Sequence, residues 1–258
     1  MFVSDMSPMP HVTVDQFVKE HHNKEKKNHN KGFKEILEKE IQREMIHTGE
    51  DTRFAHNRME LSGVAITTPE YSHTTRGEKF YKFEVKSLRH SDTPDFIPCI
   101  CSEFLVEDIK GGDRVHLLGQ VRTQNLHDAD GKSHLNVYFF ACERLELIDE
   151  DINEVEFDGY LTRGVTRRNT PFGREIADIL IAVNMAYGRS SYLPCIAWGR
   201  NATKCTKTGT GDHVACVGRF QSRDYQKIIN DETVTKTTYE MSLSAINEIG
   251  KEEKKNED

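Results

Sequence analysis

The sequence predicts a mainly β chain that contains two tandem five-stranded barrels, preceded by an N-terminal helical segment. Two observations support this fold class. From residue 57 onward, apolar residues come in short alternating or continuous runs separated by Gly, Pro, Asn and Asp, which is typical of antiparallel strands. The same plan of residues then occurs twice along this part of the chain, which indicates two copies of one domain.

The N-terminal extension, residues 1–56, is polar and has a helical pattern. Thr13, with Gln16 three residues later, fits a capping box at the start of a short helix. A second helix is predicted over about 33–47, because Leu37, Ile41 and Met45 form one narrow apolar stripe. We expect this stripe to pack on a barrel or on a second chain.

The two copies have a constant spacing. Matching residues lie 96 positions apart, as in Asn57 with Asn153 and Gly63 with Gly159. After a three-residue insertion the spacing becomes 99, as in the pair Gly119 and Gly218. A repeat of this length is a whole domain rather than a solenoid unit. We therefore predict domains at 57–151 and 152–250, followed by a short charged tail at 251–258.

Each copy supplies about five strands. In the second copy these are predicted near 154–164, 175–184, 191–199, 212–222 and 235–247, with a short helix over 200–205. Five strands with a helix between the third and fourth is the plan of an OB barrel, which binds oligonucleotides on one face. An SH3-like barrel has the same strand count, and strand propensity alone does not separate the two folds.

Composition and motifs exclude several classes of protein. No stretch of the sequence is long and apolar enough for a membrane helix, so we expect a cytoplasmic protein without a membrane partner. The six cysteines form no Cys-x-x-Cys pair and are expected to be buried thiols rather than metal ligands. Because no nucleophile elbow, phosphate loop or zinc-protease motif occurs, we expect neither an enzyme nor a bound cofactor.

The formal charge of −7 argues against a nucleic-acid partner, but the charge is unevenly distributed. Residues 57–151 contain 11 Lys and Arg against 17 Asp and Glu, whereas residues 152–250 contain 12 against 11. The acidity is therefore concentrated in the first repeat.

Three segments of the second repeat carry a family resemblance. "NEVEFDGYLTRGVTRRNTPFGREIADILIAVNMAY", "SYLPCIAWGRNA" and "GDHVACVGRFQSRDY" occur in order, and together they resemble the bacterial single-stranded DNA-binding protein (SSB) family. The first repeat has a degraded form of the same framework in "NRMELSGVA", "FIPCICSEF" and "GGDRVHLLGQVRTQ". The resemblance implies OB barrels and sequence-tolerant binding of single strands.

Members of this family stack bases on aromatic side chains. The positions of this chain that match the stacking residues are Tyr187, Tyr192, Trp198 and Tyr225. Aromatic platforms bind any base, because every base has a π-face. Strand alternation predicts that Tyr192 and Trp198 point outward while Leu193, Cys195 and Ala197 point inward, although both rings are also compatible with a barrel core.

Basic residues gather in the first part of the second repeat. Four arginines and no acid occur between positions 163 and 174, namely Arg163, Arg167, Arg168 and Arg174. Guanidinium groups pair with phosphate oxygens, so this cluster is a candidate phosphate-tracking groove, although solvated hairpin charges would have the same pattern. Arg200, Arg219 and Arg223 are further candidates.

The first repeat departs from the family at the stacking positions. Its aligned residues are Ser91, Phe96, Ser102 and Leu126, so that only Phe96 is left as a first-barrel contact. With its acidity, this predicts that the first barrel has lost most DNA affinity and serves assembly. The chain also lacks the Pro-Phe tip at which family members recruit replication proteins, so recruitment by that route is not expected.

The leading hypothesis is sequence-tolerant binding and protection of single-stranded DNA in replication, recombination or repair, in a bacterial, nucleoid-associated location. Because SSB proteins commonly assemble four barrels, a chain with two barrels is expected to form a homodimer. The alternative hypothesis is an assembly or primosome-type accessory subunit whose barrels have little DNA affinity of their own.

Overall fold

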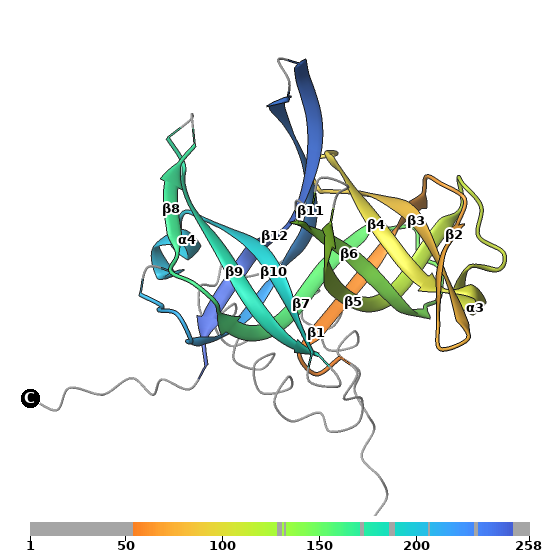
Figure 1. The fold of residues 1–258 in the computed structure, drawn as a ribbon, viewed down its shortest axis with the longest axis horizontal. Helices are drawn as coiled ribbons and strands as arrows, with labels where there is room; N and C mark the ends of the chain where they lie inside the picture. Colours follow the sequence, from red (N-terminus) through yellow and green to blue (C-terminus); the bar gives the residue numbers. More distant parts are fainter. Residues whose placement is uncertain are drawn as a thin grey trace, which may run out of the picture. The chain divides into compact units, whose positions relative to one another are not determined.

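The computed structural model describes residues 54–127, 131, 133–170, 173–185, 189–205, 207–229 and 232–249. The chain divides into two compact units, Met1–His47 and Thr48–Asp258, and every described residue belongs to the second unit. The predicted N-terminal helices, the charged tail and Tyr187 lie outside the described residues. The described part is mainly β, with twelve strands and two short helices (Figure 1).

The first half of the described chain forms a closed ring of paired strands. β1 pairs with β3 and β5, β3 pairs with β4, and β6 completes the ring by pairing with β5 and, in parallel, with β4. β2 extends the ring as one arm of a hairpin with β3. The elements are β1 (Asn57–Ala65), β2 (Glu70–Thr75), β3 (Glu78–Leu88), β4 (Pro94–Ser102), α3 (Glu103–Val106), β5 (Arg114–His127) and β6 (Ser133–Arg144).

The second half repeats this order of elements. β7 pairs with β9 and β11, β9 with β10, β10 in parallel with β12, and β12 with β11, while β8 extends β9 as a hairpin arm. The elements are β7 (Ile152–Leu161), β8 (Thr166–Asn169), β9 (Glu175–Met185), β10 (Arg189–Trp198), α4 (Arg200–Cys205), β11 (His213–Ile229) and β12 (Glu232–Glu248). We call the two rings the first and second barrel.

The strands predicted in the second repeat are confirmed, and so is the helix over 200–205. Two features differ from the prediction. β8 is an additional strand, and β11 and β12 continue as a long hairpin beyond the barrel (Figure 1). Both additions consist largely of exposed residues, so they lack the buried alternating positions from which strands are predicted.

β1 and β7 join the two barrels into one sheet of twelve strands. They pair antiparallel over six positions, with Met59 opposite Val155 at the centre of the pairing. These two residues are 96 positions apart and therefore occupy the same place in the two repeats. The two barrels are accordingly related by an approximate two-fold axis that passes between Met59 and Val155.

An asparagine occupies the same place at the end of the pairing in each barrel. The backbone ladder between β1 and β5 ends at Met59 and Gly119. Two positions beyond, the Asn57 side chain donates to the carbonyl of Val121 (2.7 Å) and accepts from its amide (3.0 Å). Asn153 makes the matching pair of bonds to Phe220, at 2.7 and 2.9 Å. Each asparagine side chain thus makes the two hydrogen bonds that a backbone partner would otherwise make, at the point where its strand leaves the ladder and pairs with the other barrel.

Two glycines lie where strands approach closely. A Cβ on Gly63 would lie 2.3 Å from the carbonyl oxygen of Lys86, and a Cβ on Gly159 would lie 2.4 Å from that of Ala182. Both contacts occur where a barrel closes, through the pairing of β1 with β3 and of β7 with β9. A side chain at either position would separate the strands that close the barrel.

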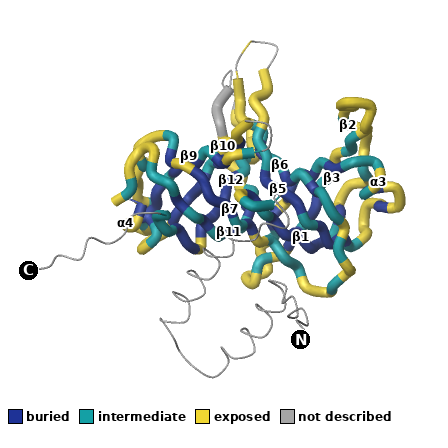
Figure 2. The backbone as a smooth tube through the Cα atoms, turned by 90° about the horizontal axis from the view of Figure 1, so that it is seen from below, coloured by how far each residue is buried: buried dark blue, intermediate teal, exposed yellow. Residues whose placement is uncertain are grey.

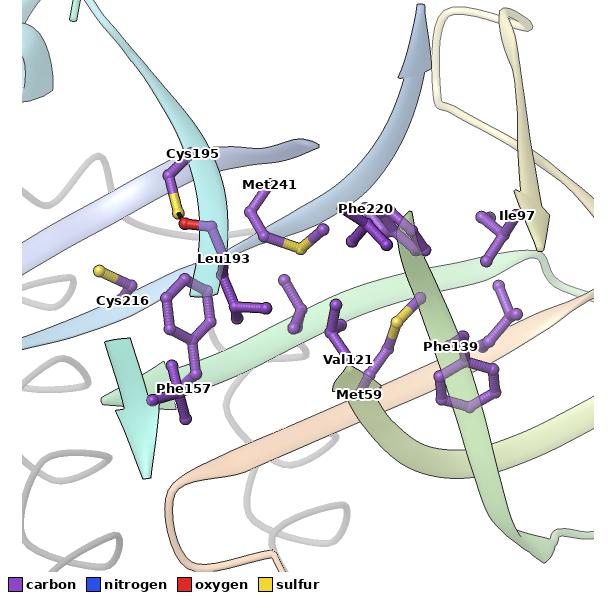
Figure 3. Packing of buried hydrophobic residues seen from close by; sticks show 14 of the residues in the cluster. Met59, Ile97, Val121, Phe139, Phe157, Leu193, Cys195, Cys216, Phe220 and Met241 are labelled. Atoms are coloured by element: carbon purple, nitrogen blue, oxygen red, sulfur yellow. Dashed lines mark hydrogen bonds between the residues drawn. The ribbon is translucent and has the colours of Figure 1, made fainter. Parts of the chain in front are cut away.

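The buried apolar residues form one cluster that extends through both barrels. Figure 2 shows the buried positions following the barrel strands, whereas loops and hairpin arms are exposed. Met59, Val121 and Phe139 of the first barrel and Phe157 and Phe220 of the second belong to the same cluster (Figure 3). The barrels are therefore held together by apolar packing as well as by the pairing of β1 with β7.

Burial of the cysteines agrees with the prediction for five of the six. Cys99, Cys101, Cys195, Cys205 and Cys216 are buried free thiols, whereas Cys142 is half-buried. Within the described residues, no helix has the length and apolar character needed to cross a membrane.

Candidate nucleic-acid interface

The third strand of the second barrel, β10, separates its side chains as predicted. Tyr192 is 45% exposed and Trp198 38% exposed, whereas Leu193, Cys195 and Ala197 are buried in the barrel. Ile196 has the outward parity but is buried at 3% exposure, because neighbouring strands flank it on both sides. Both aromatic rings are therefore at the surface rather than in the core.

The pairing register shows which other residues share this surface. Directly paired residues lie on the same side of a sheet. Trp198 is paired with Ile176 of β9, which is paired in turn with Arg168 of β8. Tyr192 lies six residues from Trp198 along the strand, a separation of about 20 Å at roughly 3.3 Å per residue. The two rings therefore mark the two ends of one surface that has room for several bases.

The β11–β12 hairpin brings Tyr225 to the same surface. Ile196 is paired with Ser242 of β12, and Ser242 is paired with Arg219 of β11. Alternation from Arg219 places Gln221, Arg223 and Tyr225 on this side as well. Tyr225 is 40% exposed and faces Lys236 across the hairpin. We call this surface the second-barrel face; it comprises Arg168, Ile176, Asp178, Tyr192, Ile196, Trp198, Arg219, Gln221, Arg223, Tyr225, Lys236 and Glu240.

The four predicted arginines do not act as one cluster. Arg168 lies on the second-barrel face and donates to Asp178 through Nε (2.6 Å) and Nη2 (3.0 Å). Arg167 lies on the opposite side of β8 and forms an ion pair with Glu175. The side chains of Arg163 and Arg174 are exposed, and neither forms an ion pair with another described residue.

The ion pair with Asp178 holds the Arg168 guanidinium group on the second-barrel face, where β9 lies between Arg168 and Trp198. The hydrogen bond that Arg168 donates to Asp178 raises the pKa of Arg168 and so favours its charged form. An arginine has more N–H donors than these two bonds use, so it can still donate to a phosphate. Asp178 weakens that attraction, because it neutralises part of the positive charge of the face.

Basic residues of β11 and β12 complete the second-barrel face. Arg223 lies 3.4 Å from the carboxylate of Glu240, which also accepts a bond of 2.7 Å from Gln221. Arg219 donates to Gln221 (3.0 Å), and burial lowers its pKa. The sequence pattern named Arg219 and Arg223 as further candidates but did not reveal Lys236, because residues 233–237 of the hairpin are all exposed and have no buried face.

In the first barrel, Phe96 is the only aromatic residue among those aligned with the stacking positions. Phe96 is 36% exposed, and its amide donates to Ser222 Oγ of the second barrel (2.9 Å). The matching bond runs from the Tyr192 amide to Thr123 Oγ1, also at 2.9 Å. The surface of each barrel thus adjoins the β-hairpin of the other. Tyr187, the remaining predicted stacking residue, lies outside the described residues.

Comparison with known proteins agrees with the repeat and with the fold. The sequence of residues 152–248 matches the single-strand binding protein family. No curated protein sequence matches the chain. The solved structures that are similar to it include two of the single-stranded DNA-binding protein from Thermus aquaticus.

The first of these structures is a deletion mutant, which has a TM-score of 0.61 at 18% identity over 78% of this chain and 98% of its own. The wild-type structure has a TM-score of 0.60 at 19% identity over 76% of this chain and 94% of its own. At these identities the similarity establishes the fold. The structural likeness extends over most of the chain, whereas the match to the single-strand binding protein family is confined to residues 152–248, the second barrel.

Proposed function

We propose that the chain binds single-stranded DNA with little sequence preference, mainly through the second-barrel face. The observation that carries this proposal is that Tyr192 and Trp198 of β10 and Tyr225 of β11 all lie exposed on that face. Bases stack on such rings whatever their identity. Arg168, Arg223 and Lys236 surround the rings, where they attract the phosphates between successive bases.

The proposal includes the finer description of the domains. Residues 57–151 and 152–250 are two OB barrels, because each ring of strands has the five-stranded plan of that fold and α4 lies between the third and fourth strands of the second ring. Arg163 and Arg174 bind phosphate more readily than Arg167 and Arg168, whose charges are already paired. Tyr187 is a fourth stacking residue.

A homodimer with four barrels is part of the proposal, because one chain contains two. The role that fits such binding is protection of exposed strands in replication, recombination or repair. Analytical ultracentrifugation of the full chain tests the assembly, since a monomer at micromolar concentration would contradict it.

Fluorescence of Trp198, the single tryptophan of the chain, provides a direct test of binding. We would titrate the protein with oligo(dT) of about 35 nucleotides, a length that spans several OB sites of roughly 4 to 16 nucleotides. The expected result is strong quenching that weakens with salt and is unaffected by duplex competitor. Absence of both quenching and binding at low salt would refute the proposal and favour an assembly subunit.

Replacing single rings locates the binding surface. Tyr192→Leu should weaken binding about 5- to 150-fold, because a stacked base contributes roughly 1–3 kcal/mol. The matched control is Phe104→Leu, which removes an aromatic ring that is 83% exposed on α3. Equal affinities of the two variants would show that bases do not stack on the second-barrel face.

A further inference from the structure

We infer that the outer surface of the first barrel is a second binding platform for the same DNA strand, built from aromatic residues at positions different from those of the second barrel. The inference rests on the proposed single-strand binding. It concerns the region that has lost the aligned stacking residues, where Ser91, Ser102 and Leu126 replace aromatic rings.

A continuous row of π systems crosses four strands of the first barrel. The His73 ring stacks on Phe80, with centroids 5.1 Å apart and planes 14° apart. Phe80 contacts Phe140 at 5.8 Å, and the Arg122 guanidinium carbon lies 3.6 Å from the centroid of the Phe140 ring. These residues come from β2, β3, β6 and β5, and the phenylalanines are only half-buried.

The register places this row on the outside of the barrel. Phe80 is paired with Ser102, and Ile100, on the same side of β4, is paired with Phe140. The inward residues of the same strands, Phe83 and Phe139, belong to the core. We call this surface the first-barrel face; it comprises Glu70, His73, Glu78, Phe80, Lys82, Glu84, Lys86, Phe96, Ile100, Arg122, Tyr138 and Phe140.

The residues of this row are aligned with positions of the second barrel that are not stacking positions, so alignment with the family does not reveal the row. Phe80 corresponds to Ile176 of the second barrel. Phe140, which is paired with Ile100, corresponds to Ser242, which is paired with Ile196. Ile176 is the residue paired with Trp198. In the first barrel, Ser102 of β4 occupies the place of Trp198, and the aromatic ring is instead that of Phe80, which is paired with Ser102 on the neighbouring strand β3.

The charge of the first-barrel face suits a phosphate backbone better than the charge of the whole repeat. Lys82 and Lys86 lie on the face, and neither forms an ion pair with another described residue. Of the 17 acids in residues 57–151, the register places Glu70, Glu78 and Glu84 on this side of β2 and β3. Burial raises the pKa of Glu84, which makes its neutral form more accessible than that of an exposed glutamate.

Contacts between the barrels connect the two faces. The Tyr192 amide donates to Thr123, the residue that follows Arg122. Burial lowers the pKa of Arg122, and the charge of Arg189, the first residue of β10, lowers it further. A DNA strand that extends from Tyr192 toward the first barrel therefore passes the cations Arg189 and Arg122 and then the Phe140 ring. Single-stranded DNA, with alternating bases and phosphates, is the partner that such alternating rings and cations fit.

The test compares a short and a long oligonucleotide on the full chain. Phe80→Leu with Phe140→Leu removes both rings but keeps apolar side chains in place. The matched control is Tyr71→Leu, which removes a ring that is 56% exposed on the opposite side of β2. Circular dichroism and thermal melting establish that each variant is folded.

We expect the double variant to bind labelled dT of about 35 nucleotides at least about 10-fold more weakly than the control, because two stacking sites are lost. Quenching of Trp198 by dT of about 10 nucleotides should be unchanged. Lys82→Gln with Lys86→Gln should reduce the salt slope of long-oligonucleotide binding by about 1.4, since each single-strand phosphate contact contributes about 0.7.

Two other outcomes are distinguishable. If the wild type quenches normally but the double variant binds the long strand as tightly as the control, the inference is wrong and the proposed function stands. If the wild type neither quenches nor binds, both fail. Photocrosslinking of the wild type to bromodeoxyuridine-substituted DNA needs no variant: crosslinks in β3 or β6 are expected, and crosslinks confined to the second barrel would overturn the inference.

Discussion

Replacing Asn57 by alanine tests whether one side chain completes the backbone ladder of the first barrel. The side chain is 1% exposed and satisfies both the amide and the carbonyl of Val121, a residue that is itself fully buried. Alanine leaves both groups without this partner in an apolar environment. Each unsatisfied buried group costs about 1–3 kcal/mol, so we expect a loss of about 2–4 kcal/mol in the free energy of unfolding.

The assay is urea unfolding, supported by thermal melting. For a chain of this size about 1 kcal/mol shifts the melting temperature by roughly 2–4 °C, so the expected decrease is about 5–15 °C. Asn125→Ala is the matched control, because Asn125 is exposed on β5 of the same barrel; its effect should stay within about 0.5 kcal/mol. Asn153→Ala should match Asn57→Ala, since Asn153 makes the same two bonds to Phe220.

Asn57→Asp separates the two bonds. It keeps the acceptor for the Val121 amide but places a carboxylate oxygen against the Val121 carbonyl, so it should destabilise at neutral pH at least as much as alanine. An Asn57→Ala protein as stable as Asn125→Ala would refute the reasoning, because it would mean that other groups or water satisfy Val121.

Two further predictions concern barrel closure and the thiols. Gly159→Ala should lower the unfolding free energy by about 1–3 kcal/mol in urea titrations, because its Cβ would overlap the carbonyl of Ala182. The control is Gly164→Ala, which should be neutral because a Cβ there meets nothing within 4 Å. Equal effects of the two variants would contradict the close approach of the strands at Gly159. Iodoacetamide at pH 8 should modify half-buried Cys142 before the buried cysteines in mass-spectrometric mapping, and rapid labelling of Cys195 would contradict its burial. Burial raises the pKa of the Cys101 thiol from its ordinary value of 9.0 to about 12. Between these two pH values the thiol is protonated in the folded chain but ionised in the unfolded chain, so the free energy of unfolding should fall as the pH rises from 9.0 to about 12.

Much of the fold was predictable because its signals are local. Alternation along β10 places Tyr192 and Trp198 outside the barrel, as observed. The equal spacing of the repeats predicts equivalent roles for Asn57 and Asn153, and their bonds to β5 and β11 are the same. β8 and the outer part of the β11–β12 hairpin were not predicted, because solvent surrounds their side chains and no periodic burial marks them.

The candidate site was only partly predictable. Arg167 and Arg168 are adjacent in sequence, and the sequence indicates one arginine cluster. In the structure they lie on opposite sides of β8 and pair with Glu175 and Asp178, whose distance along the chain gives no indication of contact. The positive charge available to a phosphate is therefore smaller than the number of arginines implies.

The sequence by itself determined the mainly β character, the internal repeat and the outward direction of the aromatic residues on β10, because these depend on the spacing of residues that are near one another in the chain. Only the tertiary structure decided that β1 pairs with β7, and that His73, Phe80, Phe140 and Arg122 form one row on the first barrel. The physical reason is that strand pairing and register join segments distant in sequence, and a shift of one residue would turn every side chain of a strand to its other side.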